Sequence, residues 1–186
     1  MVAPASIPYP LHMAEIASAP AAGPMDVAPL WSGRVVGIFI SPQAEAPMLR
    51  VDEVRAVAGQ GLEGDRYSQR AGSYSNTPGT GRQVTLIESE AVEAAGREYG
   101  LTLSPGQARR NVVTAGVSLN HLVGEDFMVG AVRLRGMRLC EPCEHLAELT
   151  GQPVVKALVH RGGLRADIVD GGVFRVGDPI VPASAG

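Results

Sequence analysis

Short apolar runs separated by glycine-rich turns make up most of the chain from residue 33 onward. Runs typical of strands occupy residues 34–40, 51–57, 83–87, 111–114, 126–129, 132–139, 165–169, 173–176 and 179–181. Ala91, Ala95 and Tyr99 recur at helical spacing and predict a helix over residues 89–99, with Gly100 as its C′ residue. Shorter helices are predicted over 144–150 and 154–160. The pattern indicates a mixed, β-rich α+β fold, a closed or half-closed β-barrel with a few short helices.

The first 32 residues differ from the rest of the chain. They are rich in Ala and Pro and show neither strand nor helix periodicity, so we predict a flexible tail. Residues 33–182 are then one domain, and residues 183–186 a short C-terminal tail. A chain of 186 residues is long enough to bury one core of this size.

Composition excludes several classes of function. The formal net charge is −3 and aromatic residues make up 4% of the chain, which argues against nucleic acid as a partner. The sequence has no apolar run of about 18 residues that could span a membrane, and its start does not have the pattern of a signal peptide. Two cysteines three positions apart are a poor disulfide framework, so we expect a reducing, cytoplasmic location.

Both cysteines lie between a predicted strand and a predicted helix, in Leu139-Cys140-Glu141-Pro142-Cys143. Backbone N–H groups and a helix dipole at such a junction favour the thiolate, the form that binds metals and attacks electrophiles. Cys143, after a proline at the helix start, is the better candidate for a functional thiol, and Cys140 is expected to pack inward. Three alternatives remain: half of a zinc site, a thioredoxin-like redox pair and two inert cysteines.

Two further segments carry candidate binding residues. In the first, Asp65 can orient Arg66 toward an anionic ligand, and Arg70 and Arg82 can add positive charge; the alternative is a surface ion pair. In the second, Arg109, Arg110 and Asn111 offer guanidinium groups for a phosphate and an amide for a heterocycle edge. The alternative for this second segment is a charged entrance to a strand.

In order along the chain, four segments together resemble the MOSC domain family, named for the C-terminal domain of molybdenum cofactor sulfurase. The resemblance covers about residues 33–182. Its landmarks are Gly61-Leu62-Glu63-Gly64-Asp65-Arg66-Tyr67, then Arg82-Gln83-Val84-Thr85-Leu86-Ile87, then Arg109-Arg110-Asn111-Val112-Val113 with the glycines that follow, and finally Leu139-Cys140-Glu141-Pro142-Cys143.

This resemblance implies a barrel related to the small barrel of pyruvate kinase and binding of a molybdenum cofactor. It implies that Cys143 ligates molybdenum and that Arg109, Arg110 and Asn111 hold the pterin phosphate. Arg66, oriented by Asp65, would position pterin or substrate. At the level of the family alone it also implies binding of pyridoxal phosphate. Because two further domains of the better-known reductases have no counterpart in the sequence, we expect a small stand-alone member.

Three hypotheses therefore compete. The first is a molybdenum-dependent reductase of N-oxygenated small molecules, such as hydroxylamines or amidoximes, which receives electrons from a separate protein. The second is a sulfur carrier that holds a persulfide on Cys143, received from a donor protein, for metal–sulfur centre assembly. The third is a non-catalytic module that binds an anion or cofactor.

Overall fold

The computed structural model describes residues 29–73, 75 and 79–183. Of the two predicted tails, residues 1–28 and 184–186 lie outside the described residues. At the start of the described chain, Trp31 already packs against the main hydrophobic core.

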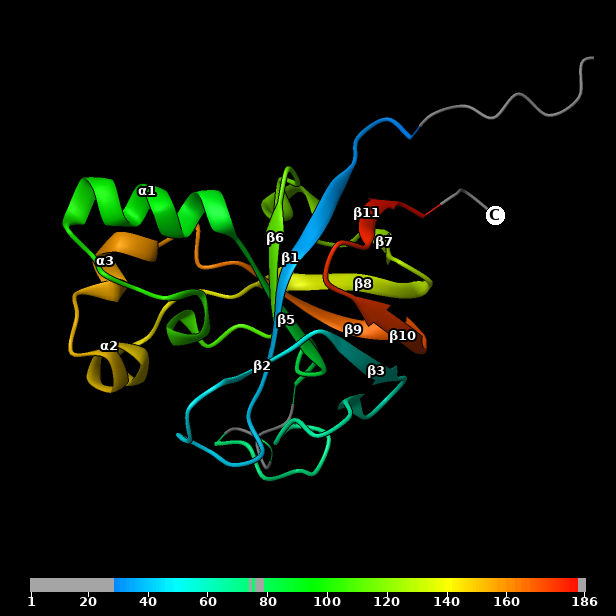
Figure 1. Ribbon diagram of the computed structural model, residues 1–186, viewed down its shortest axis with the longest axis horizontal. Coiled ribbons are helices and arrows are strands. Elements are labelled where there is room, and N and C mark those ends of the chain that lie inside the picture. Colours follow the sequence, from blue (N-terminus) through cyan, green and yellow to red (C-terminus); the bar gives the residue numbers. More distant parts are fainter. Residues whose placement is uncertain (1–28, 74, 76–78, 184–186) are drawn as a thin grey trace, which may run out of the picture.

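Seven strands of the described chain close into a barrel (Figure 1). In order around it they are β1 (Gly33–Ile40), β11 (Pro179–Pro182), β7 (Asp126–Val129), β8 (Val132–Leu139), β9 (Leu164–Asp170), β5 (Val84–Glu88) and β6 (Val112–Ala115). Neighbouring strands are antiparallel except β5 and β6, which are parallel. The ring closes where Gly33 of β1 pairs with Ile180 of β11.

The barrel interior is filled by the residues that alternate inward along these strands. In β7 and β8, for example, Phe127, Val129, Val132 and Leu134 are fully buried, whereas the residues between them are partly exposed. Such alternation places one face of each strand in the core and the other toward solvent or a second layer. The main core of this molecule therefore lies inside the barrel.

A smaller sheet covers one part of the barrel, and it changes one predicted element. The run 51–57 was expected as one strand, but the chain forms β2 (Leu49–Val51) and β3 (Glu53–Val57). β2 pairs with β1, whereas β3 pairs with β10 (Gly172–Arg175) and β4 (Gly61–Leu62). The chain therefore leaves one sheet and enters another at Asp52.

Three helices pack together beside the barrel (Figure 1). α1 (Ser89–Tyr99) connects the parallel strands β5 and β6, as a crossover must. α2 (Glu144–Thr150) and α3 (Val154–Leu158) follow the cysteine segment, and α3 ends two residues earlier than predicted. Their shared core is separate from the barrel interior; its buried members are Ala95, Leu101, Leu146, Val154, Ala157 and Leu158.

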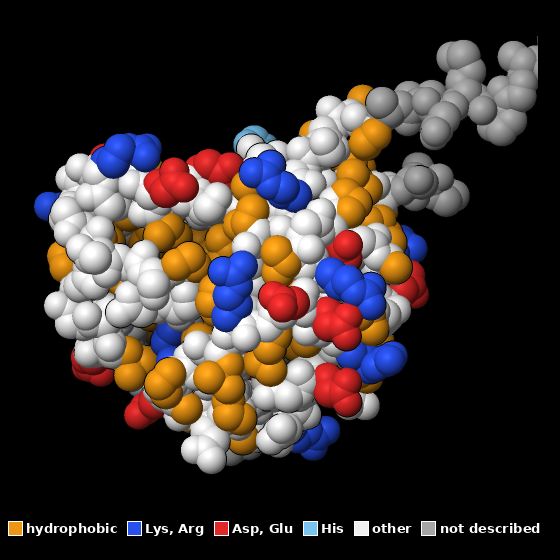
Figure 2. Space-filling model, viewed as in Figure 1, with side chains coloured by type: hydrophobic (Ala, Val, Ile, Leu, Met, Phe, Trp, Pro, Cys, Tyr) orange, Lys and Arg blue, Asp and Glu red, His pale blue; other side chains and the backbone are white. Residues whose placement is uncertain are grey.

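Two short 3-10 turns complete the fold, η1 (Pro105–Ala108) and η2 (Leu119–Leu122). The β-barrel with a few short helices confirms the predicted fold class. Among the described residues, no helix is both long and apolar enough to cross a membrane. On the face shown in Figure 2, acidic and basic side chains are interspersed, without a broad region of one sign.

Candidate functional site

A pocket lies where the cysteine segment and α2 meet the ends of β5, β6 and β9. We call it the thiol pocket. Its lining residues are Arg66, Tyr67, Ser73, Thr85, Arg109, Arg110, Asn111, Cys140, Glu141, Cys143, His145, Leu146, Leu149 and Arg165. The structure thus brings together all three segments that the sequence singled out, although about 75 residues separate Asp65 from the cysteines.

The two cysteines have different environments. Cys140 is 1% exposed, and its backbone N–H donates to Gly163 O at 2.7 Å. Cys143 is exposed and is the N-cap residue of α2. The prediction that Cys140 packs inward is confirmed, and Cys143 is the thiol that a ligand can reach.

Arg110 fixes the backbone around Cys140. Its Nε donates to Gly162 O at 2.9 Å, Nη1 to Ala108 O at 3.0 Å and Nη2 to Cys140 O at 2.8 Å. The loop approaches so closely that a Cβ on Gly162 would lie 2.5 Å from Cys140 O. Arg110 is buried, and one donor on each of its three nitrogens is already used by the protein.

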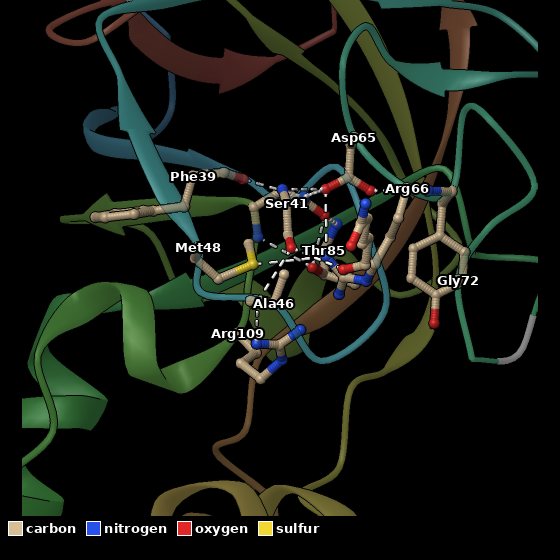
Figure 3. A network of polar contacts seen from close by, with 12 residues as sticks. Phe39, Ser41, Ala46, Met48, Asp65, Arg66, Gly72, Thr85 and Arg109 are labelled. Atoms are coloured by element: carbon tan, nitrogen blue, oxygen red, sulfur yellow. Dashed lines mark hydrogen bonds and ion pairs between the residues drawn. The ribbon is translucent and has the colours of Figure 1, made fainter.

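Asp65 is the centre of a buried polar network (Figure 3). Its Oδ2 accepts hydrogen bonds from Ser41 N at 3.1 Å and from Asn111 Nδ2 at 3.2 Å. The same oxygen lies 3.4 Å from Arg66 Nη1, and Oδ1 accepts from Tyr67 N at 3.0 Å. The Asp65 and Arg66 side chains are only 3% and 10% exposed, so this is not the surface ion pair of the alternative interpretation.

Asn111 joins that network to the barrel strands. Its Nδ2 also donates to Phe39 O at 3.2 Å, and its Oδ1 accepts from both N and Oγ1 of Thr85, at 3.1 and 2.9 Å. The side chain is 6% exposed. Its amide therefore connects β1, β5 and the Asp65 loop while it forms part of the pocket wall.

Arg109 is held differently from its neighbour. It adopts a left-handed backbone conformation with φ of 54°, which non-glycine residues rarely adopt outside turns and functional sites. Its Nη1 donates to Ala46 O at 2.8 Å (Figure 3). Burial, and after it the positive charge of Arg66, lowers the pKa of Arg109. An anion bound here would offset both effects.

Two residues of the pocket, Arg165 and His145, were not among the predicted site residues. Arg165 is the second residue of β9 and lies opposite Thr85. It is half-buried in the pocket wall, and its guanidinium has no side-chain partner among the described residues. His145 lies near two carboxylates, with Nε2 at 3.7 Å from Glu45 and Nδ1 at 3.9 Å from Glu148. The only sequence signal for Arg165 was a basic residue at the start of the predicted strand over 165–169.

Two arginines that were expected near the Asp65 segment lie outside the thiol pocket. Arg70 and Arg82 line a different cavity, together with Asp167, and do not add charge to the thiol pocket.

The described residues contain no group of three or more His, Cys, Asp or Glu side chains placed to hold a metal ion. A structural zinc site built on the cysteine pair therefore has no support in this part of the chain.

The site thus consists of an exposed thiol beside several guanidinium groups, at the junction of a closed barrel and a helical layer. Residues 73–181 match the MOSC domain family. The match covers more than half of the chain, and the chain belongs to this family. It includes Arg109, Arg110, Asn111 and both cysteines, whereas the Asp65 segment lies before it.

Solved structures agree on the fold. The YuaD protein from Bacillus subtilis superposes with a TM-score of 0.68 at 18% identity, covering 80% of this chain and 94% of that one. YiiM from Geobacillus stearothermophilus gives 0.64 at 17% identity, with coverages of 82% and 75%. YiiM from Escherichia coli gives 0.59 at 18%, with 82% and 71%. Among curated proteins, none matches this sequence.

Proposed function

We propose that this protein binds a molybdenum cofactor through Cys143 and reduces N-oxygenated compounds. The observation that carries the proposal is the exposed Cys143 thiol at a pocket whose arginines are incompletely neutralised. A thiolate is a soft ligand suited to a thiophilic metal, and guanidinium groups suit a phosphate.

The residues present fit such a cofactor, but not all in the roles that the resemblance implied. Arg109 and Arg165 have guanidinium nitrogens that no described residue engages, and they are the better candidates for the pterin phosphate. Arg110 and Asn111 direct their polar atoms to the protein, so their contribution is to fix the pocket wall. Arg66 is oriented by Asp65 as predicted and lies at the same wall.

The chemistry is a two-electron reduction. Bound molybdenum would supply the redox couple that, with two electrons and two protons, converts an N–OH group into N–H and water. The chain's own part is to hold the metal with the Cys143 thiolate, to hold the cofactor's phosphate with arginines, and to leave the rim open to substrate. The electrons would come from a separate donor protein.

Metal and pterin analysis tests this proposal. The protein and its Cys143→Ser variant are purified from a host that makes molybdenum cofactor. We expect near-stoichiometric molybdenum and pterin in the wild type and loss of molybdenum in the variant. A Cys140→Ser variant is the matched control, and it should retain the metal because that thiol is buried. Absence of both molybdenum and pterin from the wild type would overturn the proposal.

A sulfur carrier is the second candidate, and the exposure of Cys143 favours it. A persulfide carrier must receive sulfur from one protein and pass it to another, and an accessible thiol can do both. After incubation with a cysteine desulfurase, mass spectrometry should then find one added sulfur on Cys143 in protein that contains no molybdenum. An unmodified Cys143 would count against this candidate.

A further inference from the structure

A second cavity adjoins the thiol pocket and shares Arg109 and Leu149 with it. We call it the Arg50 groove. Its walls come from the end of β1, the segment leading into β2, the turn η1 and the end of α2; they include Phe39, Glu45, Pro47, Met48 and Arg50. A ligand that reaches the thiol from this side would pass Arg109.

Arg109 and Leu149 lie at the boundary between the two cavities, and Arg109 is the charged member of this pair. Arg109 Nη1 is fixed by Ala46 O, and the left-handed backbone of Arg109 directs the side chain to this position. Because Arg109 lines both cavities, one ligand can contact it from either side.

Apolar side chains line much of the groove between its charged ends. Phe39, Met48 and Leu149 contribute a ring, a thioether and an aliphatic side chain. The sulfur of Met48 is held 3.5 Å from Arg66 Nη1, a member of the thiol pocket. Ser104, Gln107 and Thr150 also line the groove, so it combines apolar side chains with polar groups that can orient a small molecule.

The groove has an excess of positive charge. Arg50 is exposed, and its guanidinium has no side-chain partner among the described residues. Within the described part of the chain, Glu45 is the only carboxylate that lines the groove, and its Oε1 lies 3.7 Å from His145 Nε2. Two arginines at an apolar surface favour a ligand with an apolar body and an acidic substituent.

We propose that the Arg50 groove binds the body of the substrate, a small compound with an apolar part and an acidic substituent that pairs with Arg50. The reacting group at the other end would then lie at the Arg109 boundary, facing Cys143. The assignment of a substrate rests on the proposed function, whereas the binding preference itself does not require molybdenum.

The test compares two isosteric probes on the protein without cofactor: 4-carboxybenzamidoxime and its neutral carboxamide. Affinities are measured by titration calorimetry, and the site is located by amide chemical-shift changes. We expect the carboxylate to bind about fivefold more tightly than the carboxamide, the size of a well-formed exposed ion pair. Arg50→Gln should remove this preference. Arg138→Gln, which removes one exposed arginine of β8 outside the groove, should keep it.

Equal affinity for the two probes, or a preference retained in Arg50→Gln, would overturn the proposal. So would shifts that avoid Met48 and the η1 residues. This result is independent of the metal analysis. If the protein shows the expected preference but never acquires molybdenum, the reductase proposal fails and the binding preference of the groove stands. If the protein acquires molybdenum but lacks the preference, only the groove proposal fails.

Discussion

The arginines that line the thiol pocket have different physical roles. Arg110 is buried and donates to three backbone carbonyls, whereas Arg165 has a half-buried guanidinium without a side-chain partner in the described chain. Buried carbonyls that lose their donors destabilise the folded state, whereas an uncommitted guanidinium is available to a ligand. Replacing Arg110 should therefore lower stability, whereas replacing Arg165 should weaken ligand binding.

Replacing Arg110 with glutamine should lower the free energy of unfolding by about 2 kcal/mol, because the carbonyls of Ala108, Cys140 and Gly162 lose charged donors. Arg165→Gln should change it by less than about 0.5 kcal/mol. In contrast, Arg165→Gln should weaken inorganic pyrophosphate binding about tenfold, the effect of one charge-assisted contact. Urea unfolding and titration calorimetry measure the two effects. An Arg165→Gln protein that binds pyrophosphate like the wild type would contradict the assignment.

This difference between residues could not be predicted from the sequence. Arg109, Arg110 and Asn111 are consecutive, and their residue types suit a phosphate and a heterocycle equally well. Which of them faces the cavity depends on the left-handed turn at Arg109 and on carbonyls that lie up to 52 residues away. The candidate segments could be selected from the sequence by their residue types, whereas the roles of the individual residues could not.

Among the elements, β7 and β8 are joined by a charge cluster as well as by their ladder. Asp126 of β7 accepts from Arg133 and Arg135 of β8, and the hydrogen bond from Arg133 is the main cause that lowers its pKa. A carboxyl with a lowered pKa in the folded state stabilises the protein above its ordinary pKa. That stabilisation is lost as the pH falls below the ordinary value.

Asp126→Asn should therefore destabilise the protein by about 1 kcal/mol at pH 7 and have a smaller effect near pH 3, where the wild type has lost part of the same contribution. Unfolding in urea at both pH values measures the difference. Asp170→Asn is the control, since this exposed carboxylate lies 4.0 Å from Arg133. An equal effect of Asp126→Asn at both pH values would refute the linkage.

Most elements follow from periodicity, because the inward residues of a barrel strand must alternate with outward ones. The exception is informative. Val51 and Val57 belong to one predicted strand, yet the chain changes sheets at Asp52. Before it β2 pairs with β1, and after it β3 pairs with β10. Local sequence does not encode this change, since both halves are strands and only their long-range partners differ.

At the scale of the whole molecule, two cores meet at the thiol pocket. The barrel core fills the ring of strands, while the helical core holds α1, α2 and α3 together. Cys143 belongs to α2 as its N-cap, and Arg165 belongs to the barrel strand β9. The geometry of the site therefore depends on both cores.

Leu158→Ala, which removes a fully buried side chain from the helical core, should cost about 3 kcal/mol. Hydrogen exchange should become faster in α2 and α3 and change less in β7 and β8, because those strands belong to the other core. Leu149→Ala serves as control, since that leucine is 39% exposed. Uniform loss of protection throughout the barrel would show that the two cores unfold as one unit.

The pairing of Gly33 with Ile180 places the first and last strands of the barrel next to each other, about one strand spacing apart. For protein engineering, this makes the barrel a natural insert. Because the start of the first strand and the end of the last strand lie side by side, the barrel can be inserted into a surface loop of a host protein. The two cut ends of that loop then stay close together. By the same geometry, a short linker could join the two strands and new ends could be opened at a surface turn, with every strand keeping its partners.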